Sequence, residues 1–204
     1  MIRDFSGLAQ ISCYYKLPPV EKYASAAEKL LADKKILGKK YIALAPGARW
    51  KTKQWPPEFF AAAAVGIAKR LPDHEFVLLG SPAEGPLCRR LQEAAGTVPV
   101  TDLSGLTTTG SLVEIIRKAK LLICNDSGPM HIAAAAGTPV LALFGPTVPA
   151  LTGPYGSLCR VVQPELNCIG CLSKSCSTEL CHSSVDPLVT ADHAIQLLEQ
   201  GVGK

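Results

Sequence analysis

The sequence carries little charge and has no long apolar run. Charged residues make up 19% of its 204 residues, and the formal net charge of +4 is dispersed along the chain. A nucleic-acid groove needs clustered Lys and Arg with interleaved aromatic residues, so we expect no nucleic-acid partner. No stretch of about 18 apolar residues is present to span a bilayer, and residues 1–6 lack the basic-then-apolar order of a signal peptide. These absences predict a cytoplasmic protein.

Two common phosphate-binding motifs are also missing. No G-x-G-x-x-G follows the first predicted strand, and no G-x-x-x-x-G-K-[ST] occurs anywhere. These absences count against a dinucleotide site of that type and against a phosphate-loop NTPase. No paired carboxylates suggest a catalytic acid and base either. The pattern therefore assigns no catalytic residue to the chain.

What is present is an alternation of short aliphatic runs with longer helical patterns, and a hydrophobic content of 48% excludes dominant disorder. The predicted strands are residues 41–45, 75–79, 100–102, 121–124, 140–144 and 160–162. The predicted helices are residues 57–69, 84–95, 111–119, 129–136 and 191–200. Strands that are apolar throughout are typical of parallel sheets buried on both faces. We therefore predict an α/β fold, a Rossmann-like parallel sheet with helices on both faces.

Residues 1–40 stand outside this alternation. The Pro18–Pro19 pair and the Lys- and Ala-rich stretch 21–35 predict a linker followed by an amphipathic helix. We therefore divide the chain into a connector, residues 1–40, and a sheet domain, residues 41–204. A stretch of 40 residues without a predicted strand, ahead of the sheet domain, suggests that the chain is the C-terminal part of a longer protein.

Polar residues gather where the predicted strands end, and ligands of open parallel sheets bind at that edge. The loop 46–56 carries Arg49, Lys51 and Lys53, which form either an anion cradle or a solvated basic loop. The segment 125–131 opens a helix at Pro129, whose free N–H groups around Ser127 and Gly128 suit a phosphate. An anion site at this edge is the prediction.

Three further polar residues adjoin this edge. Asp126 repels a phosphate, so we expect it to cap the helix or to accept a ligand hydroxyl. His131 either packs against the helix or donates a hydrogen bond to phosphate or sugar oxygens. Glu84 lies at the start of a predicted helix. Its carboxylate either interacts favourably with the dipole of that helix or binds a pair of ribose hydroxyls.

The chain has eight cysteines, of which four crowd into the polar loop 164–184. These four are Cys168, Cys171, Cys176 and Cys181. A tetrahedral zinc site, with His182 as a substitute ligand, is one interpretation, although only one pair has the tight C-x-x-C spacing. Two disulfides or four free thiols are the alternatives, and a reducing cytosol disfavours native disulfides.

Residues 125–135 resemble the signature of the bacterial heptosyltransferases, glycosyltransferase family 9. Residues 45–56, 80–84 and 137–147 agree with it in order and spacing, and the resemblance covers about residues 40–200. It implies the C-terminal half of a GT-B glycosyltransferase, the domain that holds the nucleotide sugar. The cysteine loop resembles that of heptosyltransferase II-like members.

The resemblance also implies a set of donor-binding residues. Lys53 is expected at the donor diphosphate, Glu84 at the ribose, and the start of the helix at the phosphates and sugar. The full set is Ala48, Arg49, Lys53, Glu84, Asp126, Ser127, Gly128, Met130 and His131. The family's catalytic base is a carboxylate of the other domain, so none of these residues is expected to take that role.

The function implied is binding of ADP-heptose for inverting transfer of heptose to the inner core of lipopolysaccharide. The acceptor is expected to bind the other domain, so this chain is expected to be inactive alone. Transfer needs no metal, and the site of action would be the inner face of the bacterial cytoplasmic membrane, with peripheral membrane association. The alternatives are a family member that uses another nucleotide sugar and a zinc-stapled binding module.

Overall fold

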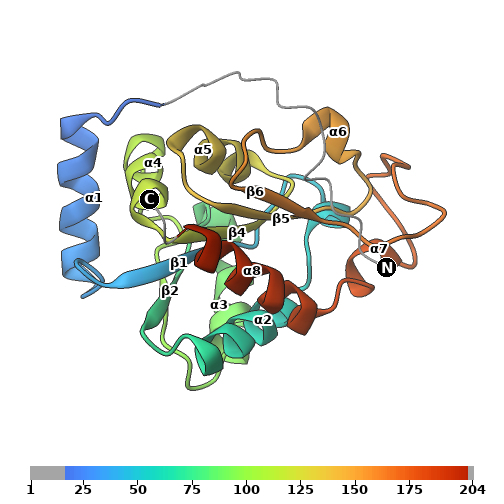
Figure 1. The fold of residues 1–204 in the computed structure, drawn as a ribbon, viewed down its shortest axis with the longest axis horizontal. Helices are drawn as coiled ribbons and strands as arrows, with labels where there is room; N and C mark the ends of the chain where they lie inside the picture. The colour runs from blue at the N-terminus through green and yellow to red at the C-terminus, as the bar shows by residue number, and fades with distance from the viewer. Residues whose placement is uncertain (1–16, 202–204) are drawn as a thin grey trace.

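A computed structural model describes residues 17–201, so the part of the predicted connector over residues 1–16 lies outside the described residues. Six parallel strands form one sheet in the order β3-β2-β1-β4-β5-β6 (Figure 1). The strands are β1 (Lys40–Ala45), β2 (His74–Leu78), β3 (Val100–Asp102), β4 (Leu121–Asn125), β5 (Val140–Leu143) and β6 (Cys159–Val162). Every predicted strand is present, and each end lies within one residue of the prediction. The predicted Rossmann-like fold is confirmed.

Helices cover both faces of the sheet (Figure 1). One face is covered by α2 (Pro57–Arg70), α3 (Gly85–Ala94) and α8 (Pro187–Gly201), and the other by α1 (Glu21–Asp33), α4 (Thr109–Lys118) and α5 (Gly128–Ala136). Alternate strand residues supply the two cores: Ile42 and Leu44 face one, while Tyr41 and Ala43 face the other. The central strands β4 and β5 are buried along their whole length, as expected for strands that lie between two cores.

Several element boundaries differ from the sequence prediction. Helix α8 begins four residues before the predicted residue 191, because the Asp186 carboxylate accepts the Leu188 N–H (2.7 Å) and caps the chain there. Glu84 lies in the short helix η2 (Pro82–Glu84), one residue before α3. The short elements η1 (Lys51–Lys53), α6 (Pro149–Thr152) and α7 (Leu180–Ser183) were not predicted. All three lie in loops at the edge where the strands end.

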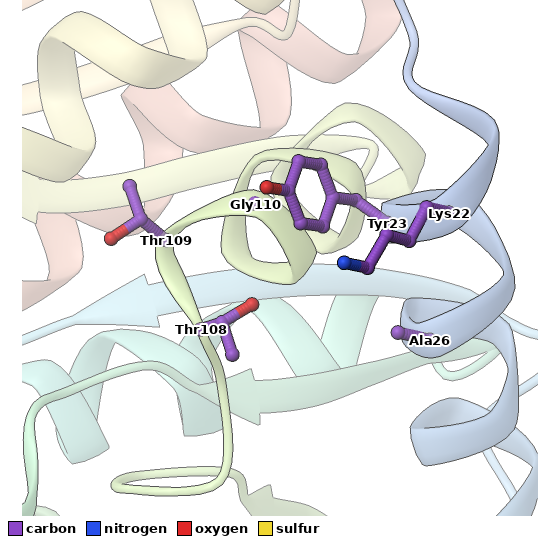
Figure 2. Close-up of a pocket in the computed structure, with 6 residues that line it drawn as sticks. All are labelled: Lys22, Tyr23, Ala26, Thr108, Thr109 and Gly110. Carbon is purple, nitrogen blue, oxygen red and sulfur yellow. The ribbon is translucent and has the colours of Figure 1, made fainter.

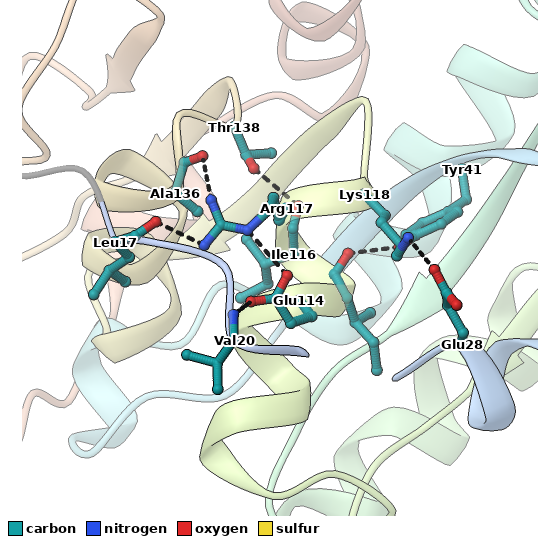
Figure 3. A network of polar contacts seen from close by, with 11 residues as sticks. Leu17, Val20, Glu28, Tyr41, Glu114, Ile116, Arg117, Lys118, Ala136 and Thr138 are labelled. Atoms are coloured by element: carbon teal, nitrogen blue, oxygen red, sulfur yellow. Dashed lines mark hydrogen bonds and ion pairs between the residues drawn. The ribbon is translucent and has the colours of Figure 1, made fainter. Parts of the chain in front are cut away.

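The described part of the connector packs tightly on the sheet domain. In α1, Ala27 and Leu31 belong to the same core cluster as Ile115 and Ile116 of α4. Ahead of α1, a network of polar contacts joins the chain at residues 17–20 to α4 and α5 (Figure 3). None of the helices within residues 17–201 combines the length and apolar character of a membrane span.

The strand order places a topological switch point between β1 and β4. From β1 the chain crosses to β2 and β3 on one side, whereas β4, β5 and β6 lie on the other. The loops that follow β1 and β4 therefore leave the same edge of the sheet at the switch point, and the ligand crevice of open α/β sheets lies outside the strand ends at such a point. This edge, called the crevice below, is where the sequence predicted an anion site.

Candidate functional site

Asn125, the last residue of β4, ties the two loops at the switch point together. Its side chain is fully buried; Oδ1 accepts the Trp55 N–H (3.1 Å), and Nδ2 donates to the Pro46 carbonyl (2.7 Å). The loop 46–55 is thus fastened at both ends to the neighbouring strand. The sequence prediction named no role for Asn125, although a polar residue ending an apolar strand is a signal that it has a buried partner.

Lys53 of the β1 loop and Asp126, which follows β4, meet at this edge. The Lys53 ammonium lies 2.7 Å from Asp126 Oδ2, with 17% and 6% of the two side chains exposed. The ammonium also lies 4.7 Å from the centre of the Trp50 ring, a cation–π contact. Although the charges touch, Asp126 Oδ2 accepts no hydrogen bond from the described residues. Asp126 therefore neutralises a cation and keeps unused acceptor capacity.

The start of α5 faces this ion pair from the end of β4. Ser127 rather than Asp126 is the N-cap residue, and the Asp126 carboxylate contacts Lys53. Of the two roles expected for Asp126, helix capping is therefore wrong, and acceptance of a ligand hydroxyl stays a prediction. The Ser127 hydroxyl donates to the Asn125 carbonyl (3.2 Å) and does not cap the helix. Gly128 begins the helix, one residue earlier than predicted, and a side chain there would meet open space. The first turn of α5 is therefore accessible to a ligand.

The next two predicted donor-binding residues of α5 have different surroundings. His131 is exposed and lies one turn into the helix. The Met130 side chain is fully buried in the core beneath, and its N–H donates to the Ser127 carbonyl (3.2 Å). Met130 therefore supports the helix from below and presents no side-chain atom to the crevice.

Glu84 reaches the crevice from the loop after β2. Its carboxylate accepts the Ser81 N–H (2.6 Å). Glu84 Oε1 occupies the place where a Cβ on Gly47 would lie, only 1.7 Å from that point. The absence of a side chain at Gly47 thus allows the loops after β1 and β2 to approach. Beside Gly47, the Ala48 carbonyl accepts a hydrogen bond from Gln54 (2.8 Å), and Arg49 is exposed.

The cysteine loop, residues 164–184, packs against the same β1 loop. Thr52 donates its hydroxyl hydrogen to the Ser173 carbonyl (2.8 Å), and Lys51 pairs with Glu179 (3.3 Å). His182 is 3% exposed, and burial lowers its pKa to about 4, so the ring is neutral at physiological pH. A Cβ on Gly145 would lie 2.5 Å from His182 Nε2. The cysteine loop therefore buttresses the short helix that carries Lys53.

The four clustered cysteines do not form a metal centre in this arrangement. Across residues 17–201, no group of three or more His, Cys, Asp or Glu side chains is arranged to hold a metal ion. The zinc interpretation of the spacing therefore receives no geometric support. All seven described cysteines are free thiols, so the two-disulfide interpretation receives none either.

A hollow lies elsewhere, between α1 and the start of α4 (Figure 2). It measures about 440 Å³ and is lined by Lys22, Tyr23, Ala26, Thr108, Thr109 and Gly110. The Tyr23 ring lies against Gly110, where a Cβ would be 2.4 Å from the ring. No predicted donor-binding residue lines this hollow, and its single cation does not make it a site. The polar crevice at the switch point is the better candidate.

Four features lie at one edge of the sheet: the Lys53 cation, the Asp126 carboxylate with its spare acceptor capacity, the Glu84 carboxylate and the open start of α5. Such a set can bind an anion that also carries hydroxyl groups. The strand order and the position of this set define a Rossmann-type domain with its ligand site at the switch point.

The family follows from comparison with known proteins. The profile described as glycosyltransferase family 9 (heptosyltransferase) matches residues 1–182. The chain therefore belongs to glycosyltransferase family 9, and the predicted resemblance is confirmed.

Relatives and solved structures agree with this assignment. Lipooligosaccharide heptosyltransferase 2 from Campylobacter jejuni is 31% identical over 169 residues, which cover 79% of this chain and 52% of the relative. Lipopolysaccharide heptosyltransferase 1 from Pseudomonas aeruginosa is 34% identical over 145 residues, covering 69% of this chain and 38% of the relative. The crystal structure of a family 9 glycosyltransferase from Veillonella parvula has a TM-score of 0.79 at 26% identity, covering 91% of this chain and 54% of that one.

The chain thus spans about half or less of the length of these relatives. The structure of E. coli ADP-heptose heptosyltransferase II gives the same picture, with a TM-score of 0.73 at 25% identity over 95% of this chain and 56% of that one. Relatives named heptosyltransferase 1 and heptosyltransferase 2 both match. The expected likeness to the heptosyltransferase II subgroup therefore stays a prediction.

Proposed function

We propose that this chain is the donor-binding half of a heptosyltransferase, which holds ADP-heptose for inverting transfer to the inner core of lipopolysaccharide. One observation carries the proposal: at the switch point Lys53 contacts Asp126 beside the open start of α5, and Glu84 lies against Gly47 of the same β1 loop. Membership of family 9 and relatives named as heptosyltransferases support it.

Within this proposal, the donor diphosphate competes with Asp126 for Lys53. A leaving nucleoside diphosphate gains negative charge in the transition state, and a cation with helix N–H groups stabilises that charge without a metal. Once Lys53 turns to the phosphates, the Asp126 carboxylate is free to accept a hydroxyl of the bound sugar. Ser127 and Gly128 offer backbone N–H groups, and His131 a ring N–H.

Glu84 would recognise the ribose of the donor. Its carboxylate is fixed by the Ser81 N–H and lies beside Gly47, so it is presented at the mouth of the crevice. A carboxylate accepts both hydroxyls of a ribose, as acidic residues do in dinucleotide-binding sheets. Ala48 and Arg49 line the β1 loop beside it, where the exposed Arg49 cation adds attraction for the phosphates.

We propose that the acceptor and the carboxylate base come from the other half of the enzyme, which makes the isolated chain inactive in transfer. The reaction would take place at the inner face of the bacterial cytoplasmic membrane, with peripheral association, because the acceptor is a lipid. A structural zinc at Cys168, Cys171, Cys176 and Cys181 stays a prediction, to be checked by metal analysis of the purified protein.

The proposal is tested by calorimetric titration of the chain with ADP, UDP and ADP-heptose. We expect binding that is selective for the adenine nucleotides, and Lys53→Ala should weaken it by about 1–3 kcal/mol, the value of a charged hydrogen bond. The matched control is Lys51→Ala, two residues away in η1, whose ammonium is exposed and pairs with Glu179. Its affinity should equal that of the wild type.

The alternatives give different results in the same titration. Preference for UDP would indicate a family member that uses another nucleotide sugar. Stoichiometric zinc with no nucleotide affinity would indicate the zinc-stapled module. Equal losses in both lysine variants would show that the net charge of the loop, and not the position of Lys53, governs binding.

A further inference from the structure

The short helix η1 carries Lys53 but cannot fix its own position. Its turn is closed by two backbone hydrogen bonds, from the Lys53 N–H to the Trp50 carbonyl (3.0 Å) and from the Gln54 N–H to the Lys51 carbonyl (2.9 Å). An isolated helical turn is unstable, because forming it fixes several backbone dihedral angles for each hydrogen bond gained. The place of the Lys53 ammonium therefore depends on contacts that reach η1 from other parts of the chain.

Trp55, two residues after η1 ends, is held on two sides. Its N–H donates to Asn125 Oδ1 at the end of β4 (3.1 Å), and its indole Nε1–H donates to the Val185 carbonyl (3.3 Å), just ahead of α8. The Trp55 side chain is fully buried. These bonds fix the exit of the chain from η1 and leave the helix itself to be held elsewhere.

Thr52, in the middle of η1, is held by the cysteine loop. It is 4% exposed, and its hydroxyl donates to the Ser173 carbonyl (2.8 Å), 121 positions along the chain. The buried His182 ring of α7 reaches the same place. The point where a Cβ on Gly145 would lie is 2.5 Å from His182 Nε2 and 3.1 Å from the Thr52 carbonyl oxygen. Thr52 therefore lies where η1, the loop after β5 and the cysteine loop meet.

The other contacts of the cysteine loop with this region are more exposed. Lys51 and Glu179 pair at 3.3 Å with 81% and 44% of their side chains exposed, and such surface pairs contribute little. The ammonium of the exposed Lys174 lies 5.2 Å from the centre of the Trp50 ring. The hydroxyl bond of the buried Thr52 is therefore the firmest of these contacts.

We propose that Thr52 is a positioning residue of the donor site, whose bond to Ser173 holds Lys53 within reach of the donor diphosphate. Lys53 follows Thr52 directly, so a shift of η1 moves the ammonium that lies 2.7 Å from Asp126 Oδ2. A shift of about 0.5 Å is enough to weaken a contact that depends on such geometry. The cysteine loop thus sets the affinity for the donor, although it supplies none of the predicted donor-binding residues. The identity of the ligand rests on the proposed function, whereas the hold on Lys53 does not.

Three variants test this role. Thr52→Val removes the hydroxyl and keeps the branched shape, whereas Thr52→Ser keeps the hydroxyl. The matched control is Thr138→Val, because Thr138 is 3% exposed and its hydroxyl donates to the Ile116 carbonyl (2.9 Å). Thr138 precedes β5 and η1 follows β1, so the two residues lie at opposite edges of the parallel sheet. The two valine variants should lose similar stability in urea denaturation, so that a difference in binding comes from the site.

The first measurement is the ADP affinity by calorimetry. Thr52→Val should bind ADP about fivefold more weakly than the wild type, the effect of a contact worth about 1 kcal/mol. Thr52→Ser should recover most of this affinity, and Thr138→Val should match the wild type. An equal loss in Thr138→Val, or no recovery in Thr52→Ser, would overturn the proposal.

The second measurement needs no nucleotide. Brief treatment with acetic anhydride, followed by peptide mass spectrometry, gives the acetylation rate of Lys53 relative to that of the exposed Lys69 of α2. In the wild type Lys53 should react slowly, because its side chain is 17% exposed and its ammonium contacts Asp126. Thr52→Val should raise this ratio of rates, while Thr52→Ser and Thr138→Val should leave it unchanged.

The two measurements separate this inference from the proposed function. If the wild-type chain binds no ADP, the proposed donor binding fails, and the acetylation ratio alone decides whether Thr52 holds Lys53 in place. A higher ratio in Thr52→Val supports the inference in that case too. An unchanged ratio overturns it, whatever the affinity for ADP.

Discussion

Two buried ion pairs of similar exposure serve the molecule in different ways. In the pair Arg117–Glu114 the cation is 24% exposed and the carboxylate 4%; in the pair Lys53–Asp126 the values are 17% and 6%. Arg117 donates to Glu114 (3.0 Å) and also to the carbonyls of Leu17 and Ala136 (Figure 3). The Lys53 ammonium contacts Asp126 and the Trp50 ring but no backbone carbonyl of the described residues, and Asp126 Oδ2 accepts no hydrogen bond from them.

The difference separates a structural ion pair from one at a binding site. Glu114 accepts the Val20 N–H as well as Arg117, so this pair clamps the chain at residues 17–20 to α4 and α5 with its polar groups satisfied. Such a network rigidifies the region and leaves nothing for a ligand. At the switch point, the unused acceptor of Asp126 and the Lys53 ammonium are free to exchange partners. Unused hydrogen-bonding capacity, more than burial of charge, marks the site.

The largest effect is expected from Arg117→Met. The substitution leaves the buried Glu114 carboxylate without its cation and also removes the donors to Leu17 and Ala136. Loss of one partner of a buried pair costs about 3–5 kcal/mol. Urea denaturation should show this loss, and hydrogen exchange should show faster exchange of the Val20 N–H, while the ADP affinity of the folded protein stays near that of the wild type.

The matched substitution at the Lys53–Asp126 pair should affect ligand binding more than stability. Lys53→Met removes one contact to Asp126 and none to the backbone, so we expect a smaller stability loss, about 1–3 kcal/mol, together with loss of ADP affinity. If Arg117→Met weakened ADP binding as strongly as Lys53→Met does, the division into a structural pair and a binding pair would be wrong.

His182 extends the comparison to a buried titratable ring without an ionic partner. Its pKa is lowered from 6.5 to about 4 by burial, so the unfolded chain takes up a proton in this interval and the folded chain does not. The free energy of unfolding is therefore unaffected by this ring above pH 6.5 and falls as the pH drops toward 4. His182 alone accounts for a fall of about 3 kcal/mol. In urea denaturation at pH 7 and pH 4, His182→Leu should reduce the difference between the two pH values by that amount.

The wild-type protein, measured at the same two pH values, is the reference for this comparison. An unchanged pH dependence in His182→Leu would show that the ring gains access to water or to a partner when it is protonated.

Much of the fold was predictable because local signals agree with one another. Apolar runs gave all six strands, and the Pro-led start and Gly137 end of α5 bounded that helix almost correctly. The early start of α8 was missed, although Asp186 supplies a capping signal. Elements such as α7, with four residues, have no periodicity to read and depend on tertiary packing.

The site was predictable only in part, because strand order brings distant loops together. Lys53 and Asp126 were both predicted, yet their pairing depends on β1 lying beside β4, which spacing alone does not give. The contact of the cysteine loop with η1 joins residues more than a hundred positions apart, as in the bond from Thr52 to Ser173. Long-range contacts of this kind leave no local pattern in the sequence.

The smallest effect is expected at the carboxylate held most weakly, Glu84, which has one backbone donor and no cation within its described contacts. In Gly47→Ala the new methyl meets the tip of this flexible side chain, which can swing away, so stability should fall by no more than about 1 kcal/mol. The displaced carboxylate loses the Ser81 N–H and its place at the crevice. ADP affinity measured by calorimetry should then fall by about 1 kcal/mol, roughly fivefold.

Glu84→Ala should lower affinity equally, and the double variant should bind no worse than either single one, since both act through the same carboxylate. Additive losses would show that Gly47 contributes to binding through its own backbone and not by making room for Glu84.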